Sequence, residues 1–128
     1  MAMDNTRSRP PFRAIRGATS VELNDRDEII SATRELLEEV IEANSLEKEE
    51  IVSIIFTSTE ELTAAFPARA ARELGLEEVA LLCCRELSID GMLPMCIRIL
   101  AHAWMPDRSP VPVYLKRAVS LRSDLASS

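Results

Sequence analysis

Several arginines lie in apolar surroundings, where a charged side chain needs a partner. Arg16 lies between Ala14 and Ala18 on one face of a predicted strand, and Arg98 lies between Ile97 and Ile99 in sequence. Leaving a guanidinium unpaired in a buried strand is costly, so an internal carboxylate or a bound anion must accompany it. Arg69 and Arg72 are three residues apart, just after Phe66 and a proline, so they would lie on the same face of a helix. Taken alone, Arg98 is better explained by a structural ion pair, but several arginines converging on one pocket would bind an anionic small molecule.

Other reactive groups are few. His102 is the one histidine, and we expect it at an interface or on the surface. The three cysteines, Cys83, Cys84 and Cys96, have no C-x-x-C spacing, so a zinc site would need mainly carboxylates. No serine, histidine and acid arrangement stands out, and the three glycines form no phosphate-binding loop. We therefore expect no metal and no cofactor.

Length and net charge further narrow the possible classes of protein. A chain of 128 residues predicts one domain with its own core. The net charge of −6 argues against a nucleic-acid partner. No apolar run approaches the roughly 18 residues of a membrane helix, and there is no apolar signal core. Together with an odd number of cysteines, this predicts a cytoplasmic protein with reduced thiols and no membrane partner.

The positions of these residues depend on the elements around them. Residues 1–11 are polar and proline-rich and predict a flexible extension before a single domain over 12–128, whose tail begins at about 121. Asp25 is a suitable N-cap, and Glu28 completes a capping-box pattern for an amphipathic helix ending near Asn44.

Alternation and apolar runs predict the remaining elements. We expect a helix over 67–74, capped by Gly75, and strands over 12–22, 51–57, 79–84, 97–105 and, with an interruption, 111–115 and 118–121. The order β-α-β-α-β-β-β mixes strands and helices and predicts the α+β class.

Four segments in order resemble the small trimeric chorismate mutases. They are FRAIRGATSVE, TEELTAAFPARAARELG, LLCCRELSIDGMLPMCIRIL and VYLKRAVSLRSDL, and the similarity runs from about Phe12 to Leu125. It implies a pseudo-α/β-barrel homotrimer with a mixed sheet and two helices per chain, and with active sites at subunit interfaces. The implied activity is an isomerase reaction of aromatic amino-acid biosynthesis, in which chorismate becomes prephenate by a [3,3] rearrangement without a cofactor.

The resemblance also implies roles for individual residues. Arg98 would reach the ether oxygen of the breaking bond, and Glu86, assisted by Cys83, would hold the ring hydroxyl. Arg16, helped by Tyr114, would bind the side-chain carboxylate. The further implied substrate contacts are Phe66, Arg69, Arg72, Leu82, Cys84, Arg85, Leu121 and Arg122.

Two features complicate this assignment. Family members often have a proline where this chain has Ser123, which affects the expected conformation of the tail. Cys83 and Glu86 have opposite parity, so the strand must end, bend or bulge near Cys84 to Arg85 if both are to meet one ligand.

Two other functions remain open at this point. A small-molecule-binding or imine-hydrolysing protein of the related trimeric barrels would also set an arginine against a carboxylate at an interface. It would not need Glu86 and Arg98 on opposite sides of a ligand. A regulatory module without activity is the third hypothesis.

Overall fold

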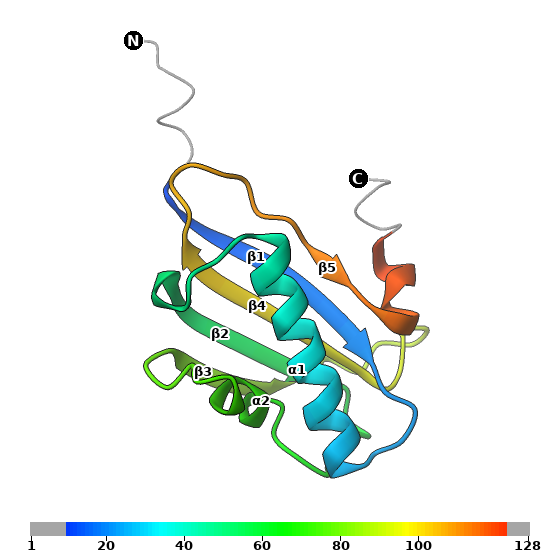
Figure 1. Cartoon of the computed structure of the whole chain (residues 1–128). Helices are drawn as coiled ribbons and strands as arrows, with labels where there is room; N and C mark the ends of the chain where they lie inside the picture. Colours follow the sequence, from blue (N-terminus) through cyan, green and yellow to red (C-terminus); the bar gives the residue numbers. More distant parts are fainter. Residues whose placement is uncertain (1–9, 123–128) are drawn as a thin grey trace.

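The computed structural model describes residues 10–122, so the predicted flexible extension over 1–11 lies almost wholly outside the described residues. So does the part of the predicted tail after Arg122, including Ser123. The fold is one five-stranded sheet with both α-helices packed on the same face (Figure 1). No helix in the described part of the chain is long and apolar enough to cross a membrane.

The long helix α1 spans Arg26–Ala43, with Asp25 as N-cap and Asn44 as C-cap, as predicted. Its apolar stripe is buried against the sheet. The capping box is only half formed. The Asp25 carboxylate accepts the Glu28 N–H at 3.0 Å, whereas the Glu28 carboxylate accepts from the backbone of Glu22 and Leu23 and so fastens the strand-to-helix connection.

The other elements follow the predicted order closely up to residue 104. They are strands β1 (Phe12–Ser20), β2 (Ile51–Ser58), β3 (Ala80–Arg85) and β4 (Cys96–Trp104) and the short helix α2 (Ala68–Glu73). The 3₁₀ helix η2 (Lys48–Glu50) was not predicted. Gly75 follows α2 with a φ of 83°, a left-handed conformation that suits glycine and supports its predicted capping role.

The sheet has the order β3-β2-β4-β1-β5. Strand β4 lies antiparallel between β1 and β2, while β2 pairs with β3 and β1 with β5 in parallel. This mixed sheet with helices on one face confirms the α+β prediction.

The C-terminal region differs from the prediction. Strand β5 is only Val113–Tyr114, and the residues predicted as a strand over 118–121 belong to the 3₁₀ helix η3, Lys116–Leu121. Lys116 adopts a φ of 54°, which turns the chain out of the sheet, and Ala118 is then buried against β1 and β4. The alternating run was too short to distinguish a strand from a helical turn.

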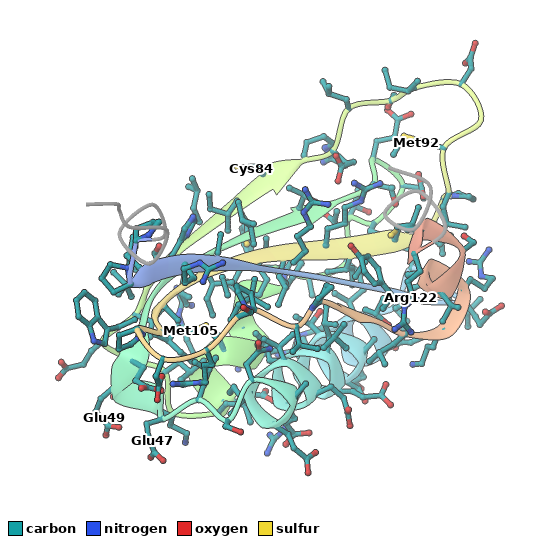
Figure 2. All side chains as sticks on the ribbon, turned by 90° about the horizontal axis from the view of Figure 1, so that it is seen from above. Glu47, Glu49, Cys84, Met92, Met105 and Arg122 are labelled. Carbon is teal, nitrogen blue, oxygen red and sulfur yellow. The ribbon has the colours of Figure 1, made fainter. Side chains whose placement is uncertain are left out.

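The two faces of the sheet have different surroundings. Ile15, Ile54, Phe56 and Ile99 face the helices and form the main core. On the other face, no α-helix of residues 10–122 covers the sheet, so we call it the helix-free face, although the 3₁₀ helix η3 packs against one end of it. In Figure 2 this face carries side chains, and the loop around Met92 rises on that side. Exposed apolar side chains on this helix-free face include Phe12, Leu82 and Trp104. His102 is half-buried there, stacked on Phe12, with Nδ1 at 3.1 Å from Ser53 Oγ.

Candidate active site

Arg98 and Glu86 meet on the helix-free face. Arg98 belongs to β4 and lies opposite Thr57 of β2 in the strand register. Glu86 follows the last residue of β3, and its N–H still bonds the Ser58 carbonyl at 2.9 Å, which holds it beside β2. Its Oε2 lies 3.5 Å from Arg98 Nε and accepts the Thr57 hydroxyl at 2.7 Å. A cation and an anion are therefore held together on a partly exposed surface.

Arg16 and Tyr114 approach the same place from the other side. Arg16 of β1 pairs with Leu100 of β4, and Ala18, one side-chain repeat further along β1, pairs with Tyr114 of β5. Within residues 10–122 the Arg16 guanidinium has no carboxylate partner, so its charge is available to a ligand.

These groups enclose one open cavity of about 380 Å³. Its lining includes five residues predicted from the sequence, which are Arg16, Glu86, Arg98, Tyr114 and Leu121 of η3. The cavity is largely apolar and presents two guanidinium groups, a phenol and a carboxylate. Such a site suits a small ligand with more than one carboxylate and a hydroxyl group.

A second group of predicted residues lies elsewhere on the chain. Phe66, Cys83, Cys84 and Arg85 line a separate cavity of about 380 Å³ between the end of β3 and the segment before α2. Cys83 packs against the core on the helix face, because its parity in β3 is opposite to that required to meet Glu86. Strand β3 does end at Arg85, yet within one chain Cys83 and Glu86 do not line the same cavity.

Comparisons with known proteins place this geometry in a family. The family model for chorismate mutase type I matches residues 12–125. The chain belongs to the chorismate mutase type I family.

Individual relatives agree with this assignment. The chain is 48% identical over 119 residues to chorismate mutase AroH of Thermus thermophilus, covering 91% of this chain and 98% of the relative. It is 40% identical over 118 residues to chorismate mutase AroH of Bacillus subtilis (strain 168), covering 90% and 93%. A solved chorismate mutase from Clostridium thermocellum superposes with a TM-score of 0.82 at 45% identity, covering 84% of this chain and 98% of that structure.

The chain is accordingly a chorismate mutase, an isomerase of aromatic amino-acid biosynthesis with chorismate as substrate and prephenate as product.

The remaining predicted contacts are spread over the chorismate mutase chain. Leu82 is exposed on the helix-free face, and Arg69 is exposed on α2. Arg72 lines a shallow groove with Leu81, and Arg122 lies at the end of η3, where Figure 2 labels it. None of these four lines the cavity that holds Arg16 and Arg98.

The prediction from sequence missed six residues that line the cavity around Arg16 and Arg98, which are Gly17, Ala18, Ile55, Thr57, Ile99 and Leu100. Among these, Ile55, Thr57 and Leu100 share strand parity with the helix-free face. Alternation within the run IVSIIFT was the available signal, but the run reads as a strand buried on both sides.

A thiol lies beneath the site but takes no part in its lining. Cys96 is buried with Ala18 and Ala118, two positions before Arg98 on β4. Burial raises the pKa of the Cys96 thiol, although the nearby Arg98 guanidinium opposes that effect. The thiol is thus neutral near physiological pH and adds no charge to the site.

Proposed function

We propose that the chain rearranges chorismate in the cavity lined by Arg16, Glu86, Arg98 and Tyr114. The observation that carries this proposal is the placement of Arg98 and Glu86 3.5 Å apart at the wall of a cavity that also contains Arg16. Chorismate carries two carboxylates, a ring hydroxyl and an ether oxygen. The side-chain carboxylate, the ring hydroxyl and the ether oxygen each have a complementary partner in the cavity.

The four side chains contact different groups of the substrate. Arg16, with the Tyr114 hydroxyl, binds the carboxylate of the enolpyruvyl side chain. Arg98 donates to the ether oxygen, on which negative charge grows as the C–O bond breaks. Glu86 accepts from the ring hydroxyl and faces the ring, which becomes relatively electron-poor.

The reaction needs orientation and charge stabilisation rather than proton transfer. In the [3,3] rearrangement the C–O bond breaks as a C–C bond forms within one molecule. The cavity holds the flexible substrate in a compact chair, which removes much of the entropic barrier. An acceleration of about a millionfold corresponds to about 8 kcal/mol, a scale that a fixed guanidinium and a confining wall supply together.

The active protein in this proposal is a cytoplasmic homotrimer with sites shared between subunits. Most of the predicted residues line one of two separate cavities of one chain, and Phe66 is 75% exposed at the second. The helix-free face also leaves Leu82 and Trp104 uncovered. Packing this face against neighbouring copies would bring the Phe66, Cys83 and Arg72 region of one subunit against the Arg98 cavity of the next.

Hybrid trimers test the shared site. Arg98→Ala and Arg72→Ala subunits, each of which we expect to be inactive as a homotrimer, are refolded together in equal amounts. If each site combines Arg98 of one subunit with Arg72 of the next, random mixing leaves both residues intact at about a quarter of the sites and restores about a quarter of the parent activity. No recovery, despite exchange of subunits shown by native mass spectrometry, would place each site within one subunit. Sedimentation of a stable, active monomer would also contradict the proposal.

The rival functions predict a different result with chorismate itself. Disappearance of chorismate, followed by its absorbance, with prephenate as the product, is the expected outcome. An imine-hydrolysing protein or an inactive regulatory module would leave chorismate unchanged.

A further inference from the structure

The Glu86 carboxylate is held by a neighbour that the sequence did not indicate. The Thr57 hydroxyl donates to Glu86 Oε2 at 2.7 Å, and Arg98 Nε approaches the same oxygen at 3.5 Å. Within residues 10–122 the structure gives Glu86 Oε1 no partner. One carboxylate oxygen is therefore occupied and the other is available.

Thr57 is well placed to control this carboxylate. It lies in β2, between Cys84 of β3 and Arg98 of β4 in the strand registers. A β-branched side chain in a strand has few rotamers, so the direction of its hydroxyl is well defined. Glu86, by contrast, lies beyond the end of β3, and its side chain is 21% exposed. A short hydrogen bond from a hydroxyl to a carboxylate is among the stronger neutral-to-charged contacts.

The separation of Glu86 and Arg98 gives this contact a consequence. At 3.5 Å the Nε–Oε2 distance is longer than a good charge-assisted hydrogen bond. Without the Thr57 hydroxyl, the carboxylate is free to turn both oxygens onto the Arg98 guanidinium in the bidentate arrangement that such pairs favour. That arrangement would occupy the donors needed by the ether oxygen and the acceptor needed by the ring hydroxyl.

We propose that Thr57 is a positioning residue, whose hydroxyl holds one oxygen of Glu86 so that the other faces the substrate and Arg98 keeps its donors available. This inference rests on the proposed roles of Glu86 and Arg98. Thr57 itself acts on the substrate only through Glu86.

A pair of substitutions separates the hydroxyl from the shape of the side chain. Thr57→Val keeps the branched shape and removes the donor, and we expect kcat/KM to fall by about 10- to 100-fold, the range for losing a hydrogen bond to a charged group. Thr57→Ser keeps the donor and should stay within about threefold of the parent. Thr19→Val is the matched control, because in the described part of the chain the Thr19 hydroxyl is buried without a partner.

A double-mutant cycle with Glu86 decides between positioning and a merely structural role. Activity is measured by the loss of chorismate absorbance for the parent, Thr57→Val, Glu86→Ala and the double variant. If Thr57 acts through Glu86, Thr57→Val has little further effect in the Glu86→Ala background. Equal losses in both backgrounds would overturn the inference, as would a Thr57→Ser variant as impaired as Thr57→Val. If Thr57→Val does not fold, Thr57→Ala takes its place in the cycle.

The cycle also separates failure of this inference from failure of the proposed site. An unchanged kcat/KM in Glu86→Ala alone would remove the proposed role of Glu86, and with it the role of Thr57. A large loss in Glu86→Ala with no loss in Thr57→Val would leave the site intact and overturn the role of Thr57 only.

Discussion

Replacing Arg98 with lysine tests the proposed transition-state contact directly. Arg98→Lys keeps the positive charge but loses the planar fork of donors that allows one side chain to serve Glu86 and the ether oxygen together. Removing a preorganised donor to a developing oxyanion typically lowers kcat by about 10²–10³, or about 2.7–4 kcal/mol. We expect a loss of at least that size in this chorismate mutase.

The structure indicates that this loss can be separated from a loss of stability. The Arg98 side chain is 44% exposed, and its ion pair with Glu86 spans 3.5 Å. Exposed pairs of this kind contribute about 0–1 kcal/mol to stability, so the fold should persist. Arg34 of α1 provides a control of similar exposure away from the cavity, because its side chain is 45% exposed and it pairs with Glu38 and with Glu73, each at 3.6 Å.

The assay is kcat from the loss of chorismate absorbance, with thermal unfolding measured on the same samples. Arg34→Lys should match the parent in both measurements, and Arg98→Lys should match it only in unfolding. If kcat of Arg98→Lys stays within about threefold of the parent, far from the loss expected for an oxyanion donor, Arg98 is not the transition-state contact.

Two further predictions concern pH. Because the proposed chemical step moves no proton, kcat should be nearly constant between about pH 6 and 8, and a bell-shaped profile with a solvent isotope effect above about two would indicate acid–base chemistry instead. The backbone N–H of Glu47, and then the Arg108 guanidinium at 2.8 Å, hold the pKa of Glu50 below its usual value, against the opposing effect of desolvation. A lowered folded-state pKa stabilises the fold above the unfolded-state pKa, and this stabilisation is lost as the pH falls through the folded value. Glu50→Gln should therefore have a lower Tm than the parent at neutral pH, with the difference shrinking below about pH 4, and equal Tm values at neutral pH would contradict the assignment.

Local patterns were sufficient to predict most elements of this chain. Helix α1 follows from its apolar spacing and from caps at Asp25 and Asn44, which are interactions among near neighbours in sequence. Strands β1 and β4 follow from alternation, because one of their faces is covered by helices and the other is not. Arg16 and Arg98 stood out because charged residues in apolar strands require a partner, but their roles as substrate contacts came from the resemblance to the chorismate mutases.

Other features depend on contacts between distant segments and were settled only by the tertiary structure. The segment over 118–121 alternates like a strand, but Lys116 turns the chain and Ala118 is buried between β1 and β4, so a 3₁₀ helix forms. Thr57 and Glu86 are far apart in sequence, but the register between strands brought the Thr57 hydroxyl to 2.7 Å from Glu86 Oε2. The structure also showed that the end of β3 at Arg85 does not bring Cys83 to Glu86, because Cys83 packs against the core on the helix face. Periodicity along a chain tells which side chains share a face, but only the pairing of strands decides which residues of different strands meet.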